Sequence, residues 1–233
     1  MLKNEKVLAA ALIMVGIIVL GCSIRSGLQS FADKERYVTV KGLAEKEVKA
    51  DHVIMPFLYT EPGNSLEELY ATVGAKNKKI MDFLLSHGIS KDEITLSEPE
   101  VRDLSTNEYR ENFNSRYMLT SVITLSTDKV DKAREIATSK LELIKQGVAL
   151  QSDYEHQAVY QFTKLNEIKP KMIAEATRNA REAAQKFAED SESKLGKIRS
   201  ASQGQFSVDY RDEFTKHIQK VRVVTSVDYY LND

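Results

Sequence analysis

The stretch that decides the fold covers residues 53–73 and reads VIMPFLYTEPGNSLEELYATV. Its first part alternates large apolar residues with other residues, which is the period of a half-buried β-strand. The inward positions are Val53, Met55, Phe57 and Tyr59. After the turn cluster EPGN, apolar residues recur at the spacing of an amphipathic helix. We therefore expect a strand followed directly by a helix, and Pro56, which lacks a backbone donor, predicts an edge strand or a bulge.

The same order of strand pairs and helices recurs along the chain. The sequence predicts strands over residues 37–42, 53–59, 94–104, 116–126, 148–152, 157–163, 198–208 and 218–231, and helices over residues 66–84, 128–146 and 167–196. The predicted order is ββαββαββαββ. Strand pairs separated by helices build antiparallel or mixed sheets with helices packed on them, so the predicted class is α+β. The strand over residues 116–126 is apolar on both faces and is expected at the centre of a sheet.

An apolar run precedes these modules. Residues 7–24, VLAAALIMVGIIVLGCSI, carry no charge and are flanked by Lys6 and Arg25. At about 1.5 Å per residue, roughly 18 residues reach about 27 Å, close to the thickness of about 30 Å of a hydrocarbon core. We therefore predict one N-terminal transmembrane helix, with a signal anchor over residues 1–25, a polar stalk over residues 26–36 and an exported domain over residues 37–233.

Two other fates of this run stay open. A cleaved secretory signal is disfavoured, because the nearest small residues suited to cleavage, Ser30 and Ala32, lie well beyond the apolar run. A lipoprotein signal would end at Cys22, where Gly21 fits the pattern and the bulky Leu20 does not. Lys3 and Lys6 weakly favour a cytoplasmic N-terminus. The predicted location is the bacterial inner membrane with the C-terminal domain in the periplasm, or a lipoprotein anchored at Cys22.

The composition is that of an ordinary globular domain. The 33 Lys and Arg residues nearly balance the 34 Asp and Glu residues, which argues against a nucleic-acid partner. Cys22 is the last cysteine of the sequence. The exported part therefore has no disulfide, no thiol nucleophile and no thiolate metal ligand.

Two segments resemble the SIMPL-domain family. Residues 40–51, VKGLAEKEVKAD, resemble its opening strand, although Ala50 stands where proline is common. Residues 176–188, ATRNAREAAQKFA, and then LGKI resemble its alanine-rich helix and the strand after it. The resemblance covers residues 37–231. It implies a periplasmic or envelope-exposed bacterial protein from a group linked to oxidative-stress defence, self-association, and no catalytic residue.

The search for chemistry in the sequence gives mostly negatives. The four histidines, His52, His87, His156 and His217, are scattered, and the sequence has no metalloprotease motif, nucleophile elbow, phosphate loop or dinucleotide fingerprint. His87 is interpreted as a helix-end residue. We therefore assign no catalytic, cofactor-binding or metal residue and no cofactor. The abundant carboxylates leave a paired acid/base site open, with the candidates Glu98, Glu100, Asp103 and Glu108.

Three features are candidates for protein contacts. The polar segment 105–114, with Tyr109, Phe113 and Arg110 beside Arg116, mixes aromatic and basic residues. A second charged, aromatic tip covers residues 209–217, DYRDEFTKH. The alanine face of residues 176–188 would allow another backbone to approach closely.

These observations predict a membrane-anchored envelope protein that acts by binding or homo-oligomeric assembly and is not an enzyme. The alternative is a periplasmic hydrolase whose carboxylate or histidine site is not visible in the sequence. A discriminating feature is the surface, because a large apolar patch favours assembly and a cleft with converging acids favours catalysis. Any role in stress defence is expected to be indirect, since the exported part holds no thiol.

Overall fold

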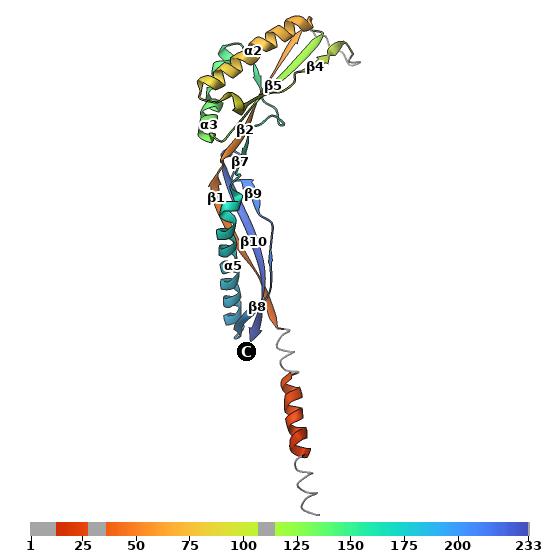
Figure 1. Ribbon diagram of the computed structural model, residues 1–233, viewed down its shortest axis with the longest axis vertical. Helices are drawn as coiled ribbons and strands as arrows, with labels where there is room; N and C mark the ends of the chain where they lie inside the picture. The colour runs from red at the N-terminus through yellow and green to blue at the C-terminus, as the bar shows by residue number, and fades with distance from the viewer. Residues whose placement is uncertain (1–12, 28–35, 107–114, 233) are drawn as a thin grey trace, which may run out of the picture. The chain divides into compact units, whose positions relative to one another are not determined.

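The computed structural model describes residues 13–27, 36–106 and 115–232 (Figure 1). The chain divides into two compact units. Unit 1 takes residues up to 46, residues 166–207 and residues from 221 onward, and unit 2 takes residues 47–165 and 208–220. Both units combine a β-sheet with helices, so the α+β part of the predicted fold is confirmed.

The prediction of a transmembrane helix is wrong. The described part of the N-terminal helix covers residues 13–27. Within the described residues, no helix is long and apolar enough to cross a membrane. The start of the predicted span, residues 7–12, and most of the predicted stalk, residues 28–35, lie outside the described residues.

Unit 2 is a six-stranded sheet with helices packed on one face. Its elements are β2 (His52–Gly63), α2 (Leu66–Ser86), β3 (Ile94–Leu96), β4 (Glu100–Asp103), β5 (Tyr117–Thr127), α3 (Val130–Ser139), α4 (Leu141–Lys145), β6 (Leu150–Gln151) and β7 (Val159–Gln161), with 3-10 turns at Lys91–Glu93 and Leu104–Thr106. The strand order is β3-β5-β2-β6, with β4 beside β5 and β7 beside β2. The predicted inward residues of β2 are all buried in the core beneath α2.

Pro56 does not mark an edge strand. β2 pairs with β5 on one side and with β6 and β7 on the other, so it lies inside the sheet. β7 pairs with residues 52–54 of β2, and β6 pairs with residues 58–59. Pro56 falls in the gap between these two short ladders, where its missing N–H costs no ladder hydrogen bond. The prediction that β5 is a central strand is confirmed, since β3 and β4 pair with its other side.

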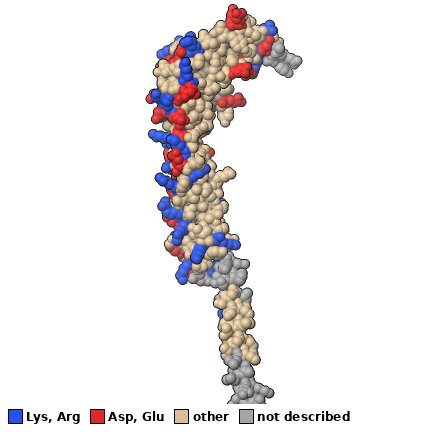
Figure 2. All heavy atoms as spheres, viewed as in Figure 1, with Lys and Arg blue, Asp and Glu red and all other residues tan. Residues whose placement is uncertain are grey.

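Unit 1 packs one long helix on a four-stranded sheet (Figure 1). Its elements are β1 (Tyr37–Lys49), α5 (Leu165–Asp190), β8 (Lys194–Gln203), β9 (Ser207–Tyr210) and β10 (Ile218–Asn232). Residues 47–49 of β1, 208–210 of β9 and 218–220 of β10 continue into unit 2. The strand order is β1-β10-β8, and β9 also pairs with β10. Figure 2 shows Lys, Arg, Asp and Glu along the α5 side of this unit, as expected for the solvated face of a helix.

The alanine stripe of α5 faces the sheet of its own unit. Ala176, Ala180 and Ala184 are fully buried, and Ala180 and Ala184 pack with Val38 and Val40 of β1. These small side chains bring the helix backbone close to β1. The prediction that this stripe contacts another copy is therefore wrong, because the sheet already covers it.

The third predicted helix ends earlier than expected. The sequence predicts a helix to residue 196, whereas α5 ends at Asp190 and β8 begins at Lys194. Glu192 takes a left-handed backbone conformation with φ of 55°, and the Ser193 N–H donates to the Ala188 carbonyl at 2.9 Å. This closure satisfies a terminal helix carbonyl and turns the chain into β8.

Candidate functional site

Unit 2 carries two adjoining clefts of about 680 and 730 Å³. Their shared wall is formed by Gln157, Ala158, Glu213, Phe214 and Lys216. These residues come from the connection between β6 and β7 and from the tip between β9 and β10. One of the two loops predicted as contact segments, residues 209–217, therefore lies at a cleft.

The second cleft has an exposed aromatic wall, which we call the aromatic patch and define as Tyr154, Val159, Tyr210 and Phe214. Phe214 is 94% exposed and Tyr154 is 89% exposed. Scattered single apolar residues are normal on protein surfaces, but two nearly bare aromatic rings beside one cleft are the kind of anchor that interfaces use.

The tip that carries Phe214 is held by hydrogen bonds. The Asp212 carboxylate accepts from the backbone N–H groups of Phe214 at 2.9 Å and Thr215 at 2.6 Å. It also accepts from the Thr215 hydroxyl and from the Arg211 guanidinium. The hydrogen bonds from Thr215 and then Arg211 hold the pKa of Asp212 well below its usual range. Phe214 is therefore presented to solvent on an ordered turn.

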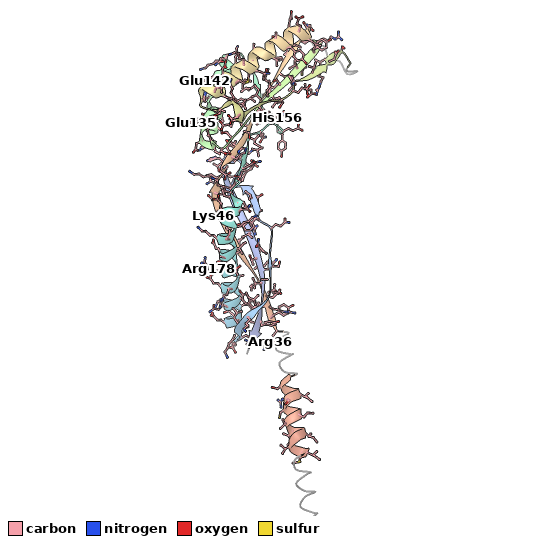
Figure 3. All side chains as sticks on the ribbon, viewed as in Figure 1. Arg36, Lys46, Glu135, Glu142, His156 and Arg178 are labelled. Atoms are coloured by element: carbon pink, nitrogen blue, oxygen red, sulfur yellow. The ribbon has the colours of Figure 1, made fainter. Side chains whose placement is uncertain are left out.

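The first cleft has three cationic side chains and two histidines in its wall, and we call it the basic cleft. It is lined by Arg134, Lys140, His156, Lys216 and His217, and the one carboxylate among its described lining residues is that of Glu213 (His156 is labelled in Figure 3). Burial lowers the pKa of His217, and the charges of Arg134 and Arg211 lower it further. The imidazole of His217 is therefore biased toward its neutral form.

Lys140 is the most unusual of these cations. It lies between α3 and α4, and its Nζ is 4.7 Å from the centre of the Phe57 ring. Burial lowers the pKa of its ammonium. Within the described part of the chain, no carboxylate lies close enough to Lys140 to form an ion pair.

A hydroxyl, an imidazole and a carboxylate form a chain on another part of unit 2. His52 Nδ1 lies 2.7 Å from an oxygen of Asp128, and Nε2 lies 3.1 Å from the hydroxyl of Ser126. This is the connectivity of a Ser-His-Asp triad. None of the three residues lines either cleft, and the Asp128 side chain is 86% exposed. No local motif in the sequence marks these residues, because only the pairing of β2 with β5 brings residues 52 and 126 together.

Two of the four carboxylates left open as an acid/base site, Asp103 and Glu100, have cationic partners. Asp103 accepts from Ser105 and Arg116, and these bonds hold its pKa at about 2. Glu100 lies 3.6 Å from the Arg102 guanidinium. A general acid needs a raised pKa, which is the opposite of what Asp103 shows. Glu108 and residues 107–114 of the other predicted contact loop lie outside the described residues.

The remaining histidines have local partners. His87 lies at the end of α2 with Nδ1 2.8 Å from the Phe83 carbonyl, so its interpretation as a helix-end residue is confirmed. His156 Nδ1 lies 2.8 Å from the Asp153 carboxylate. Over the described ranges, no group of three or more His, Cys, Asp or Glu residues is placed to hold a metal ion.

A family model matches most of the chain. The model is SIMPL, described as a protein of unknown function (DUF541), and it matches residues 38–228. The chain belongs to the SIMPL family. The resemblance of residues 40–51 and 176–198 to SIMPL proteins is thereby confirmed. No curated protein matches the chain.

The residues that identify the SIMPL domain differ from those of the candidate site. Gly42 and the alanines of α5 form the contact between strand and helix in unit 1. The aromatic patch and the basic cleft belong to unit 2 and lie outside these motifs. The SIMPL motifs therefore account for the fold and do not point to the clefts.

Proposed function

We propose that this SIMPL-domain protein acts by binding, and that it assembles with a second copy of itself through the aromatic patch. The observation that carries this proposal is Phe214, which is 94% exposed on a turn held by Asp212. An ordered aromatic side chain loses little conformational entropy when it becomes buried against a partner.

The charges around the patch suit a symmetric contact. Glu213 and Lys216 line the same cleft as Phe214 and carry opposite charges. In a two-fold dimer the same patch meets itself, so Glu213 of each copy can face Lys216 of the other. The patch is therefore chemically complementary to a second copy.

The Phe214→Ser variant tests this assembly. We expect the wild-type protein to form a dimer that dissociates on dilution, and Phe214→Ser to weaken the dimer about tenfold because an interface anchor is lost. Light scattering across a concentration series measures the mass. Phe187→Ser is the control, since Phe187 is 57% exposed on α5 and lies outside the patch. A wild-type protein that stays monomeric at every concentration would show the proposal to be wrong.

We further propose that the protein works in the bacterial cell envelope. The support is its membership of the SIMPL family, since the resemblance to that family implies an envelope-exposed protein. Any part in oxidative-stress defence is proposed to be indirect, because the sequence holds no cysteine after Cys22. Cell fractionation with an antibody against the protein tests the location, and recovery in the cytosolic fraction alone would contradict it.

A second candidate function is ester hydrolysis at Ser126, which the chain of Ser126, His52 and Asp128 favours. The Ser126 hydroxyl would attack the ester carbonyl carbon while its proton passes to His52 Nε2. His52 would then deliver this proton to the departing alcohol, and water would hydrolyse the acyl-serine. None of these three residues lines either of the two described clefts, which makes this candidate weaker than binding.

A fluorophosphonate probe tests the hydrolase candidate. If Ser126 is activated, the probe labels the wild-type protein, and the Ser126→Ala variant loses the label. Ser200→Ala is a matched control, because the Ser200 hydroxyl bonds directly to Asp228 at 2.6 Å without an imidazole between them. An unlabelled wild-type protein would remove hydrolysis at this serine from consideration.

A further inference from the structure

We propose that the basic cleft binds a small organic anion, a carboxylate or a phosphate monoester, whose charged group pairs with Lys140 and whose apolar part packs against the cleft wall. This binding is a different activity from assembly through the aromatic patch, although the two clefts share the wall of Gln157, Ala158, Glu213, Phe214 and Lys216.

Lys140 is the cleft residue best suited to bind an anion. Its side chain is half-buried, and its described neighbours offer it the Phe57 ring and no carboxylate. Removing an ammonium from water without a counter-charge is costly, and a cation–π contact offsets only part of this cost. An anion in the cleft would supply the missing partner. The other cations of the cleft already have polar partners, since Arg134 pairs with Asp131 at 3.3 Å and Lys216 bonds to Gln157 at 2.8 Å.

The charges that face the cleft favour an anion. Arg134, Lys140 and Lys216 line it against the one described carboxylate, Glu213. Glu135 on α3 and Glu142 on α4 are labelled in Figure 3, and both are exposed and absent from the cleft lining. Asp131 of α3 pairs with Arg134, so the net positive charge of the cleft rests mainly on Lys140 and Lys216.

The apolar part of the lining argues for an organic ligand. Pro56, Ile144, Leu150, Tyr160 and Phe214 also border the basic cleft. A volume of about 680 Å³ lies within the usual range of small-molecule sites. A hydrated inorganic ion would leave these side chains without a partner, whereas a ring or an alkyl chain would bury them.

Titration calorimetry of the full-length protein at neutral pH tests this site with four probes: benzoate, phenyl phosphate, inorganic phosphate and benzyl alcohol. We expect benzoate or phenyl phosphate to bind at least about tenfold more tightly than benzyl alcohol, which lacks the charge. We expect the same probe to bind more tightly than inorganic phosphate, which lacks the ring. The tighter of the two aromatic anions identifies the charged group.

The Lys140→Met variant makes the test specific. It should weaken binding of the aromatic anion about tenfold or more, and it should unfold at the same or a higher temperature because a half-buried charge without a carboxylate partner is removed. Lys145→Met is the control, since Lys145 is exposed on α4 and does not line the cleft. Equal binding of benzoate and benzyl alcohol, or unchanged anion binding by Lys140→Met, would overturn the proposal.

Discussion

Replacing Gly42 with valine is expected to prevent unit 1 from folding. A Cβ at this position would lie 1.8 Å from the Ala176 carbonyl oxygen and 2.4 Å from the Ala180 backbone nitrogen. Both atoms belong to the backbone of α5, so no side-chain rotation can relieve the clash. The helix would have to move away from β1, which would open the packing of Val38, Val40, Ala180 and Ala184. We expect a loss of more than about 4 kcal/mol in the free energy of unfolding, or no folded protein.

Urea unfolding followed by circular dichroism measures this effect. Valine suits a strand, so a loss of stability cannot be assigned to β-propensity. Gly74→Ala is the matched control, because Gly74 lies within α2 and a Cβ there meets nothing within 4 Å. We expect this control to gain about 0.5–1 kcal/mol from helix propensity. A Gly42→Val protein with wild-type stability would contradict the close packing of α5 on β1.

The sequence predicts the strands and helices well where one period dominates. The alternation in residues 53–59 and the two apolar faces of residues 116–126 identify β2 and β5. It predicts the alanine stripe of α5 as a site of close approach but not the surface that covers it. Small residues indicate that another backbone can come near. Only the packing of α5 on the folded sheet shows that this backbone is β1.

The candidate site can be predicted only in part from the sequence, because contacts between distant segments leave no local pattern. The tip over residues 209–217 stands out because aromatic and charged residues lie between two strands. Tyr154 and Lys140 do not stand out, since each looks like an ordinary surface residue until the fold brings it to a cleft. His52 and Ser126 are far apart in the chain, and the register of β2 on β5 makes them neighbours.

Glu93 is expected to make unit 2 sensitive to acid. Burial raises the pKa of Glu93, but hydrogen bonds from Lys129 at 2.8 Å, Thr127 at 2.5 Å and the Ser90 N–H at 2.8 Å outweigh it and lower the pKa from 4.5 to about 2. At about 1.4 kcal/mol per pKa unit, the ionised carboxylate contributes at most roughly 3.5 kcal/mol. Because Lys129 is 41% exposed, solvent screening reduces this to about 2 kcal/mol.

The Glu93→Gln variant tests this contribution through its pH dependence. The carboxylate has a lowered pKa in the folded state, so its contribution is complete above about pH 4.5 and is lost as the pH falls toward about 2. We expect Glu93→Gln to be less stable than wild type by about 2 kcal/mol near pH 7, and the difference to fall by at least about half near pH 3. Urea unfolding at a series of pH values measures it. Asp92→Asn removes an exposed carboxylate from the same turn and should change stability little at any pH. A difference between Glu93→Gln and wild type that stays constant with pH would show that Glu93 acts through its shape and not through its charge.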